Sequence, residues 1–234
     1  MGLYNYIGNG PTQGDTGNAG ILSMPEHFDL KAKGNIYEAA PLGIGGATLK
    51  FYLDAKNTAS YSGSGTTWSD LSGNSNDFSI TNPSWNNNGY FSLGDSTSYN
   101  INRSGVLGED NMTVFFLMAT TDTQSLMIDN GGSNYLGAYR SNNKFYSSNV
   151  SGDKDIYVDT TSRDNLYDYI RGGSFILITI TDCDFSFSGY AFNAYSSYQF
   201  GNGSLRALGA YSGNFTSSNV TELYNWFNDK GYFS

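Results

Sequence analysis

Residues 49–102 do most to restrict the folds open to this 234-residue chain. Short runs within this stretch alternate apolar with other residues, as at Leu49, Phe51 and Leu53. A period of two is the pattern of a strand with one buried face. Gly, Ser, Asn and Asp fill the segments between the runs, and these residues favour turns. The stretch therefore predicts short strands joined by tight turns, and it shows no catalytic residue of its own.

Similar runs recur at regular spacing from Ala47 onward, which favours a single β-sandwich. Two of them, 112–118 and 175–180, are continuously apolar, so we expect both at the centre of a sheet with both faces covered. Tyrosine (19) and phenylalanine (15) are abundant, and we expect these rings to build much of the core. The candidate strands are 48–54, 76–81, 89–93, 98–102, 112–119, 124–129, 134–140, 144–148, 155–159, 174–181, 185–194 and 204–211.

The C-terminal region predicts a helix. Apolar residues at i, i+3, i+4 and i+7 form one helix face, and these are Val220, Leu223, Tyr224 and Phe227. Thr216 or Ser217 is placed to cap the start of the helix, and Gly231 to end it. Trp226 falls off the apolar face, and we expect it to be exposed.

Residues 1–46 do not have the pattern of a sheet domain, and we predict that they form an extended arm before a domain at 47–234. Ser23 and Glu26 have the spacing of a capping box, which predicts one short helix at about 24–33. The glycine-rich segment 41–46 is interpreted as a linker. Such an arm must be held by its own domain or by neighbouring subunits, and we favour the neighbours. Its candidate docking residues are Tyr4, Tyr6, Ile7, Ile21, Leu22 and Phe28.

Motifs at both ends of the sheet region are similar to those of a known family. The first comprises Leu53-Asp54-Ala55 and then Trp68-Ser69-Asp70-Leu71-Ser72-Gly73-Asn74-Ser75-Asn76. The last comprises Phe215-Thr216, Val220, Tyr224-Asn225 and Lys230-Gly231-Tyr232. These residues resemble laminin-G-like domains of the concanavalin A type, especially those in structural proteins of tailed phages. The middle of the chain matches by strand pattern alone. The family's arginine and glutamate are replaced by Ser212/Gly213 and by Asn219.

The resemblance implies an all-β fold, an antiparallel jelly-roll sandwich of the concanavalin A type with a C-terminal helix. It also implies a non-enzymatic virion structural protein, and we favour a capsid decoration protein attached through its arm. The alternatives are a tail or fibre/adaptor component and a carbohydrate-binding module that adsorbs to host glycans. The expected partners are virion proteins, either major capsid or tail protein, and further copies of this chain. The expected location is the virion surface, after synthesis in the host cytoplasm.

Composition and residue content argue against several other functions. The net charge of −9 disfavours nucleic acid, whose phosphates need clustered Lys and Arg. No apolar run approaches the length of a membrane span, and Cys183 is the only cysteine. A Ser-His-Asp triad would have to use His27, the only histidine. A glycosidase needs two facing carboxylates. We expect no enzyme, because the glutamates that could supply them fall in predicted helices or loops: Glu26, Glu38, Glu109 and Glu222.

Two kinds of ligand remain open. Sugars bind to aromatic side chains flanked by Asn or Asp, and the candidates are Trp85, Asn86, Asn87, Asp129 and Asn130. Aromatic residues at strand spacing belong to a core more often than to a sugar-binding surface. Calcium prefers oxygen ligands from acidic loops, and two sets qualify: Asp153, Asp155 and Asp159, or Glu109, Asp110 and Asn111. We favour solvated acidic loops as the explanation of both sets, so no cofactor or metal site is assigned.

Overall fold

The computed structural model describes most of the chain beyond residue 39. The described residues are 40–81, 84–93, 100–103, 111–120, 125–129, 135–139, 144–148, 155–163, 173–183, 190–193 and 203–234. The chain divides into two units, Met1–Ala39 and Ala40–Ser234. All described residues belong to the second unit, so the predicted arm helix and the six candidate docking residues lie outside them.

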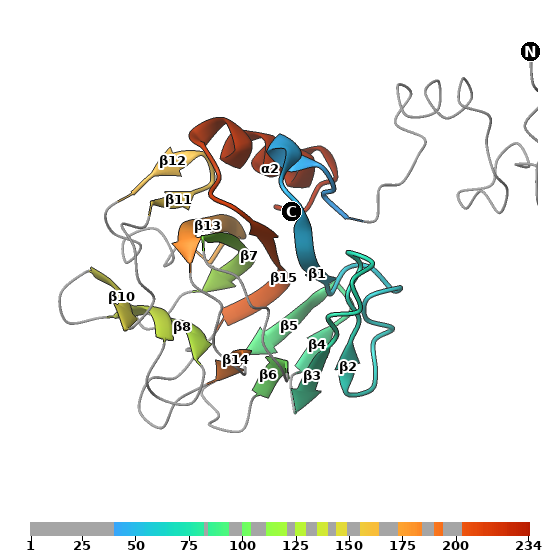
Figure 1. The fold of residues 1–234 in the computed structure, drawn as a ribbon. Coiled ribbons are helices and arrows are strands. Elements are labelled where there is room, and N and C mark those ends of the chain that lie inside the picture. Colours follow the sequence, from blue (N-terminus) through green and yellow to red (C-terminus); the bar gives the residue numbers. More distant parts are fainter. Residues whose placement is uncertain are drawn as a thin grey trace, which may run out of the picture. The chain divides into compact units, whose positions relative to one another are not determined.

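Two antiparallel sheets form a sandwich (Figure 1). The first sheet runs in the order β12 (Thr161–Ser162), β11 (Ile156–Val158), β13 (Ile176–Cys183), β7 (Met112–Thr120), β15 (Gly203–Ser212), β5 (Tyr90–Leu93) and β4 (Ser84–Asn86). Strand β1 (Leu49–Asp54) also pairs with β15. The second sheet runs β10 (Lys144–Ser148), β9 (Tyr135–Tyr139), β8 (Ser125–Asp129), β14 (Tyr190–Asn193), β6 (Asn100–Arg103), β3 (Phe78–Thr81) and β2 (Thr67–Trp68).

The predicted fold class is confirmed for the described residues. The continuously apolar segments form β7 and β13, which pair with each other and have further strands on their other edges. Both are buried along nearly their whole length, as predicted from their composition. The sequence did not predict β2, β4 and β12, because two or three residues are too few to show a period.

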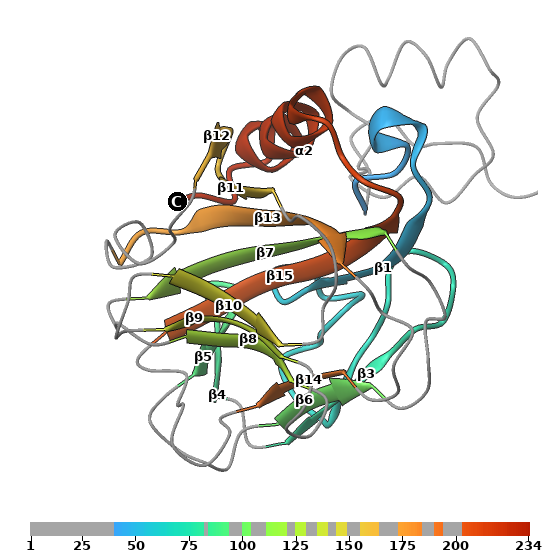
Figure 2. The ribbon, with the colours of Figure 1, turned by 60° about the vertical axis from the view of Figure 1, so that its left-hand side comes forward.

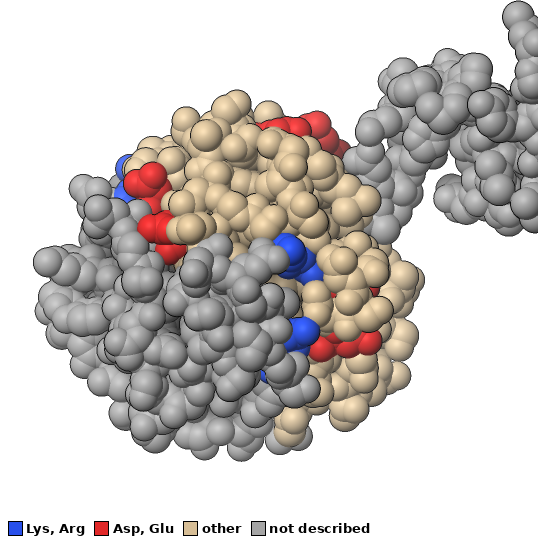
Figure 3. Space-filling model, viewed as in Figure 1, with Lys and Arg blue, Asp and Glu red and all other residues tan. Residues whose placement is uncertain are grey.

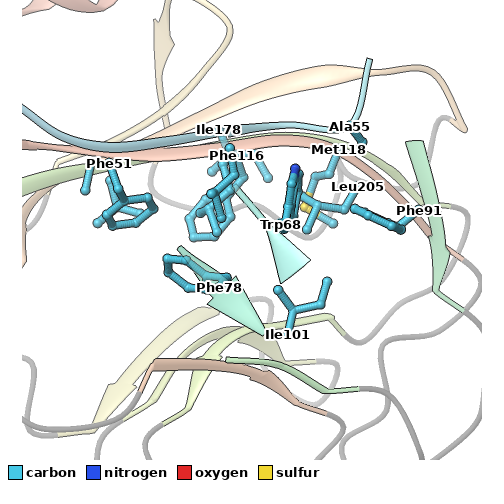
Figure 4. Close-up of a cluster of buried hydrophobic side chains, with 14 of the residues drawn as sticks. Phe51, Ala55, Trp68, Phe78, Phe91, Ile101, Phe116, Met118, Ile178 and Leu205 are labelled. Atoms are coloured by element: carbon cyan, nitrogen blue, oxygen red, sulfur yellow. The ribbon is translucent and has the colours of Figure 1, made fainter. Parts of the chain in front are cut away.

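Aromatic side chains fill the space between the sheets (Figure 4). Phe51 of β1 meets Phe78 of β3 with ring centroids 5.1 Å apart. Trp68 is fully buried and lies edge-on to Phe91, at 4.8 Å between centroids. The expected aromatic core is therefore present, and Trp68 belongs to it.

The turn after Trp68 closes against β1 through its own polar side chains. The Asp70 carboxylate accepts hydrogen bonds from the backbone N–H groups of Tyr52 (2.9 Å), Ser72 (2.8 Å) and Asn76 (2.9 Å). The Asn76 amide donates to the carbonyl oxygen of Lys50 at 2.7 Å. Because these groups bind the chain itself, the motif that gave the family resemblance is part of the scaffold.

The outer face of the first sheet is covered by helix α2 (Ser217–Asp229) (Figure 2). Val220, Leu223 and Phe227 are buried there, as the helical pattern predicted. Thr216 is the N-cap, and its side chain and that of Asn219 form a reciprocal capping box. Asn219 thus supplies the second half of the box, since its side-chain oxygen accepts the Thr216 N–H at 2.9 Å.

Trp226 is half-buried, so the prediction that it is exposed was wrong. Its ring lies edge-on to Tyr52 at 5.9 Å and packs beside Tyr232 at 5.9 Å. Both neighbours come from outside the helix, one from β1 and the other from the turn after α2. A helical pattern alone does not reveal such a contact.

Residues 41–46 are not a linker. Ile44, in the short 3₁₀ helix η1 (Ile44–Gly46), is buried in the cluster beneath α2, and Ala40 is buried with it. The Tyr211 hydroxyl donates to the Pro41 carbonyl oxygen, and the Gly45 N–H donates to the Glu222 carboxylate at 3.1 Å. The packed unit therefore begins at Ala40, before the predicted boundary at 46/47. The prediction rested on the glycine content of this segment, which does not show that Ile44 is buried.

Candidate functional site

A groove of about 680 Å³ opens beside the β4–β5 hairpin. Segments far apart in the sequence meet there: the hairpin, the residues after β1, the start of β13, the middle of β15 and the end of the chain. Its lining residues are Lys56, Thr58, Trp85, Asn87, Asn88, Gly89, Tyr90, Phe175, Arg206 and Ser234.

The β4–β5 hairpin turns through residues 87–89. Asn86 pairs with Tyr90 across the turn, and its side chain accepts the Asn88 N–H at 2.9 Å. Gly89 has φ of 75°, and a Cβ there would lie 2.6 Å from the Cα of Lys56, so only glycine fits. This close approach places Asn87 and Lys56 on the same groove. Asn86, which the sequence suggested as a sugar ligand, holds the turn together and is not among the residues that line the groove.

Trp85 forms one wall of the groove in a fixed orientation. Its indole N–H donates to the carbonyl oxygen of Ala55 at 3.2 Å. Tyr61 packs against it with ring centroids 6.1 Å apart, and Gly63 lies against its six-membered ring. The side chain is half-buried by these contacts, and the rest of it borders the groove.

Arg206 reaches the groove because of a β-bulge. The register of β15 against β7 shifts between Leu205 and Ala207, which leaves Arg206 as the extra residue. Leu205 belongs to the inter-sheet core and Ala207 to the α2 side, so the bulge turns Arg206 towards the α2 side as well. A charged residue in an otherwise uncharged strand thereby avoids the core.

The Arg206 side chain is 3% exposed and binds the end of the chain. Its Nη1 donates to the carbonyl oxygens of Tyr232 and, at 2.8 Å, Ser234. Its Nη2 donates to the Asn88 carbonyl at 3.3 Å, and the guanidinium lies 3.8 Å from the centroid of the Phe175 ring. Burial lowers the pKa of Arg206, but an arginine remains charged in proteins.

The Arg206 Nε is different from the other donors of this side chain. It is buried, and it donates to no atom in the part of the chain that the structure describes.

The buried carboxylate of Asp54, the last residue of β1, supports this region. Asp54 accepts hydrogen bonds from the hydroxyls of Tyr52 (3.2 Å) and Tyr232, and from the Lys56 N–H at 2.8 Å. Burial raises the pKa of Asp54, and these hydrogen bonds oppose that rise. The contacts tie the C-terminal turn to β1, so Asp54 positions the groove and is not one of its lining residues.

Lys56 is the second cation of the groove. Its ammonium donates to the Gly231 carbonyl oxygen at 2.9 Å and lies 4.8 Å from the centroid of the Tyr232 ring. Partial burial lowers the pKa of Lys56, and the nearby charge of Arg206 adds to this. On the face shown in Figure 3, the described Lys and Arg side chains form small separate patches.

The groove contains two of the predicted sugar ligands, Trp85 and Asn87. Asp129 lies in β8 of the second sheet, opposite Tyr135, and Asn130 lies outside the described residues. Sequence reasoning missed Lys56, Phe175 and Arg206. A single arginine within the apolar run of β15 was the one local signal available.

The calcium candidates are only partly covered by the described residues. Asp159 accepts the Leu177 N–H at 3.0 Å, and Asp155 and Asn111 are exposed. Within the described ranges, no group of three or more His, Cys, Asp or Glu side chains is placed to hold a metal ion. In the same ranges, the helices fall short of the length and apolarity that a membrane span needs.

Comparisons with known proteins bear on the fold only. No family model matches the chain, and no curated protein matches it. A Trypanosoma rangeli sialidase with 2,3-difluorosialic acid is similar to it, with a TM-score of 0.50 and 10% identity over 83% of this chain and 36% of that one. The binding domain of botulinum neurotoxin serotype D has a TM-score of 0.49 and 13% identity over 76% of this chain and 52% of that one.

The chain thus spans about half of the neurotoxin domain and about a third of the sialidase. At these identities the likeness shows a β-sandwich and nothing about activity.

Proposed function

We propose that this chain is a non-enzymatic structural protein of a tailed-phage particle, specifically a capsid decoration protein. In this proposal the segment 1–39 attaches the protein to the particle, and the sandwich faces outward from the virion surface. Synthesis takes place in the host cytoplasm, and the partners are the major capsid protein and further copies of this chain. A tail or fibre/adaptor component with tail-protein partners is the alternative within the same class.

The observation that carries the proposal is the division of the chain at 39/40. Helix α2, η1 and the sheet bury a cluster that already includes Ala40 and Ile44, so the packed unit extends up to the division. The segment before it contains the six apolar docking candidates in a glycine-rich context. A packed module preceded by a separate apolar segment suits attachment to a larger assembly. The virion context comes from the resemblance of the motifs at both ends of the sheet region to domains of tailed-phage structural proteins.

Incorporation into particles tests this proposal. Particles are assembled with the full chain, with the fragment 40–234, and with a full chain carrying Tyr4→Ser, Tyr6→Ser and Phe28→Ser. We expect only the unmodified full chain to sediment with particles. A Lys230→Gln chain, changed on the sandwich, is the matched control and should assemble normally. Normal incorporation of a folded fragment 40–234 would contradict the assigned role of the segment.

A carbohydrate-binding role is the second candidate, and the groove favours it. Trp85 offers an indole in a fixed orientation, and Asn87 offers an exposed amide beside it. Binding sites for small molecules combine apolar and aromatic walls with a few polar groups in this way. A glycan array probed with the full chain tests it. Selective binding that is lost in Trp85→Ala would support the role, and silence across the array would exclude it.

A further inference from the structure

We infer that the groove selects a sugar ring bearing a carboxylate, of the uronic acid class, with Lys56 pairing with the carboxylate and Trp85 contacting the ring. This inference rests on the carbohydrate-binding role proposed above. It adds the charge of the ligand and the residue that recognises that charge.

The charges on the groove are the first reason. The lining contains two cations, Lys56 and Arg206, and none of the described lining residues is Asp or Glu. The whole chain, by contrast, carries a net charge of −9. The buried Asp54 carboxylate interacts electrostatically with both cations and offsets part of their charge, so Lys56, the exposed one of the two, is the cation that can attract an anion here. A neutral sugar would not benefit from such an arrangement.

Lys56 has the donors and the fixed position that carboxylate binding needs. An ammonium has three N–H donors, and the hydrogen bond to Gly231 uses one of them. That bond and the Tyr232 ring limit the positions that the flexible side chain can take. The neighbouring turn also approaches the Lys56 backbone closely at Gly89. Less rotamer freedom is therefore lost when a ligand binds.

Arg206 lines the groove, but its side chain binds the chain itself. Its two Nη groups donate to backbone oxygens of Tyr232, Ser234 and Asn88. Its Nε is buried, so a ligand in the groove would not contact it. Lys56 is therefore the cation of the groove that is left to bind a carboxylate.

The size and walls of the groove favour a sugar over a small inorganic anion. A volume of about 680 Å³ lies within the range of ordinary small-molecule sites. Trp85, Tyr90 and Phe175 give it extended aromatic walls, which a simple anion would not contact. Asn87 adds an amide that both donates and accepts, as ring hydroxyls require.

Calorimetric titration of the full chain with two oligosaccharides tests the inference. One probe is built of glucuronic acid, and the other is built of glucose, which has the same ring without the carboxylate. We expect the glucuronic acid probe to bind up to about fivefold more tightly, in keeping with one partly exposed ion pair. Rising salt should weaken the binding of this probe alone.

Lys56→Gln should abolish the preference for the glucuronic acid probe, so that the two probes bind the variant with equal affinity. Lys230→Gln removes the same charge outside the groove and should have no effect. Equal affinities for both probes, or unchanged binding by Lys56→Gln, would overturn the inference while the carbohydrate-binding role stands. Absence of binding to the glucuronic acid probe would also overturn the inference, and silence across the glycan array would overturn the carbohydrate-binding role with it.

Discussion

The start of the packed unit can be tested by two substitutions two residues apart. Ile44 is 3% exposed and packs beneath α2, whereas Leu42 is 62% exposed. Replacing Ile44 by Ala removes three carbon groups, worth about 0.8 kcal/mol each in transfer free energy, and leaves a cavity. We therefore expect Ile44→Ala to lower the free energy of unfolding by about 3 kcal/mol. Leu42→Ala should change it by no more than about 0.5 kcal/mol.

Urea unfolding of the full chain, followed by fluorescence, measures both variants. The midpoint should fall for Ile44→Ala at an unchanged slope, because the transition exposes the same surface. In a thermal scan the same loss corresponds to a fall of about 2–4 °C per kcal/mol for a unit of this size. If both variants unfold at the same midpoint, residues 41–46 are a linker, as their composition indicated, and the boundary at Ala40 is wrong.

Three further substitutions test the packing and electrostatics of the first sheet. Gly209→Ala would place a Cβ 2.3 Å from the Phe115 ring. It should lower the free energy of unfolding in urea by about 1–3 kcal/mol, and an unchanged value would contradict this packing. Thr216→Ala removes the N-cap of α2 and should cost about 1 kcal/mol, while Ser218→Ala, its exposed neighbour, should be nearly neutral by the same assay. Burial raises the pKa of Asp54 in the folded protein above the ordinary 3.8. The contribution of Asp54 to the free energy of unfolding is therefore fully present below pH 3.8, and it is lost as the pH rises through the pKa of the folded protein. The stability of wild type relative to Asp54→Asn should therefore fall as the pH rises above 3.8, and a rise over that range would refute the assignment.

The sequence predicted the parts of the fold that are determined by residues close together in the chain. Strand β7 is a continuous apolar run, and the capping residue and apolar face of α2 lie within one segment, so both were placed nearly at their observed bounds. Strand β4 has three residues, too few for a period, and was missed. The burial of Ile44 and Trp226 depends on partners far along the chain. Composition therefore gave the wrong answer for Ile44, and the helical pattern gave the wrong answer for Trp226.

The groove shows the same limit. Trp85 and Asn87 were proposed from residue type alone, and the structure places both on it. Lys56 and Arg206 were not proposed, because the first depends on the approach of a distant hairpin and the second on a β-bulge. Contact between two segments far apart in the sequence produces no pattern in a short stretch of residues, and neither does a β-bulge.

The central claim is that this chain is a structural component on the outside of a phage head. Electron microscopy of intact particles, labelled with a gold-conjugated antibody raised against the fragment 40–234, tests it most directly. We predict regular labelling over the head shell, and no labelling on particles assembled without residues 1–39. Labelling confined to the tail would contradict the decoration role in favour of the tail alternative, and particles without any label would contradict the virion assignment itself.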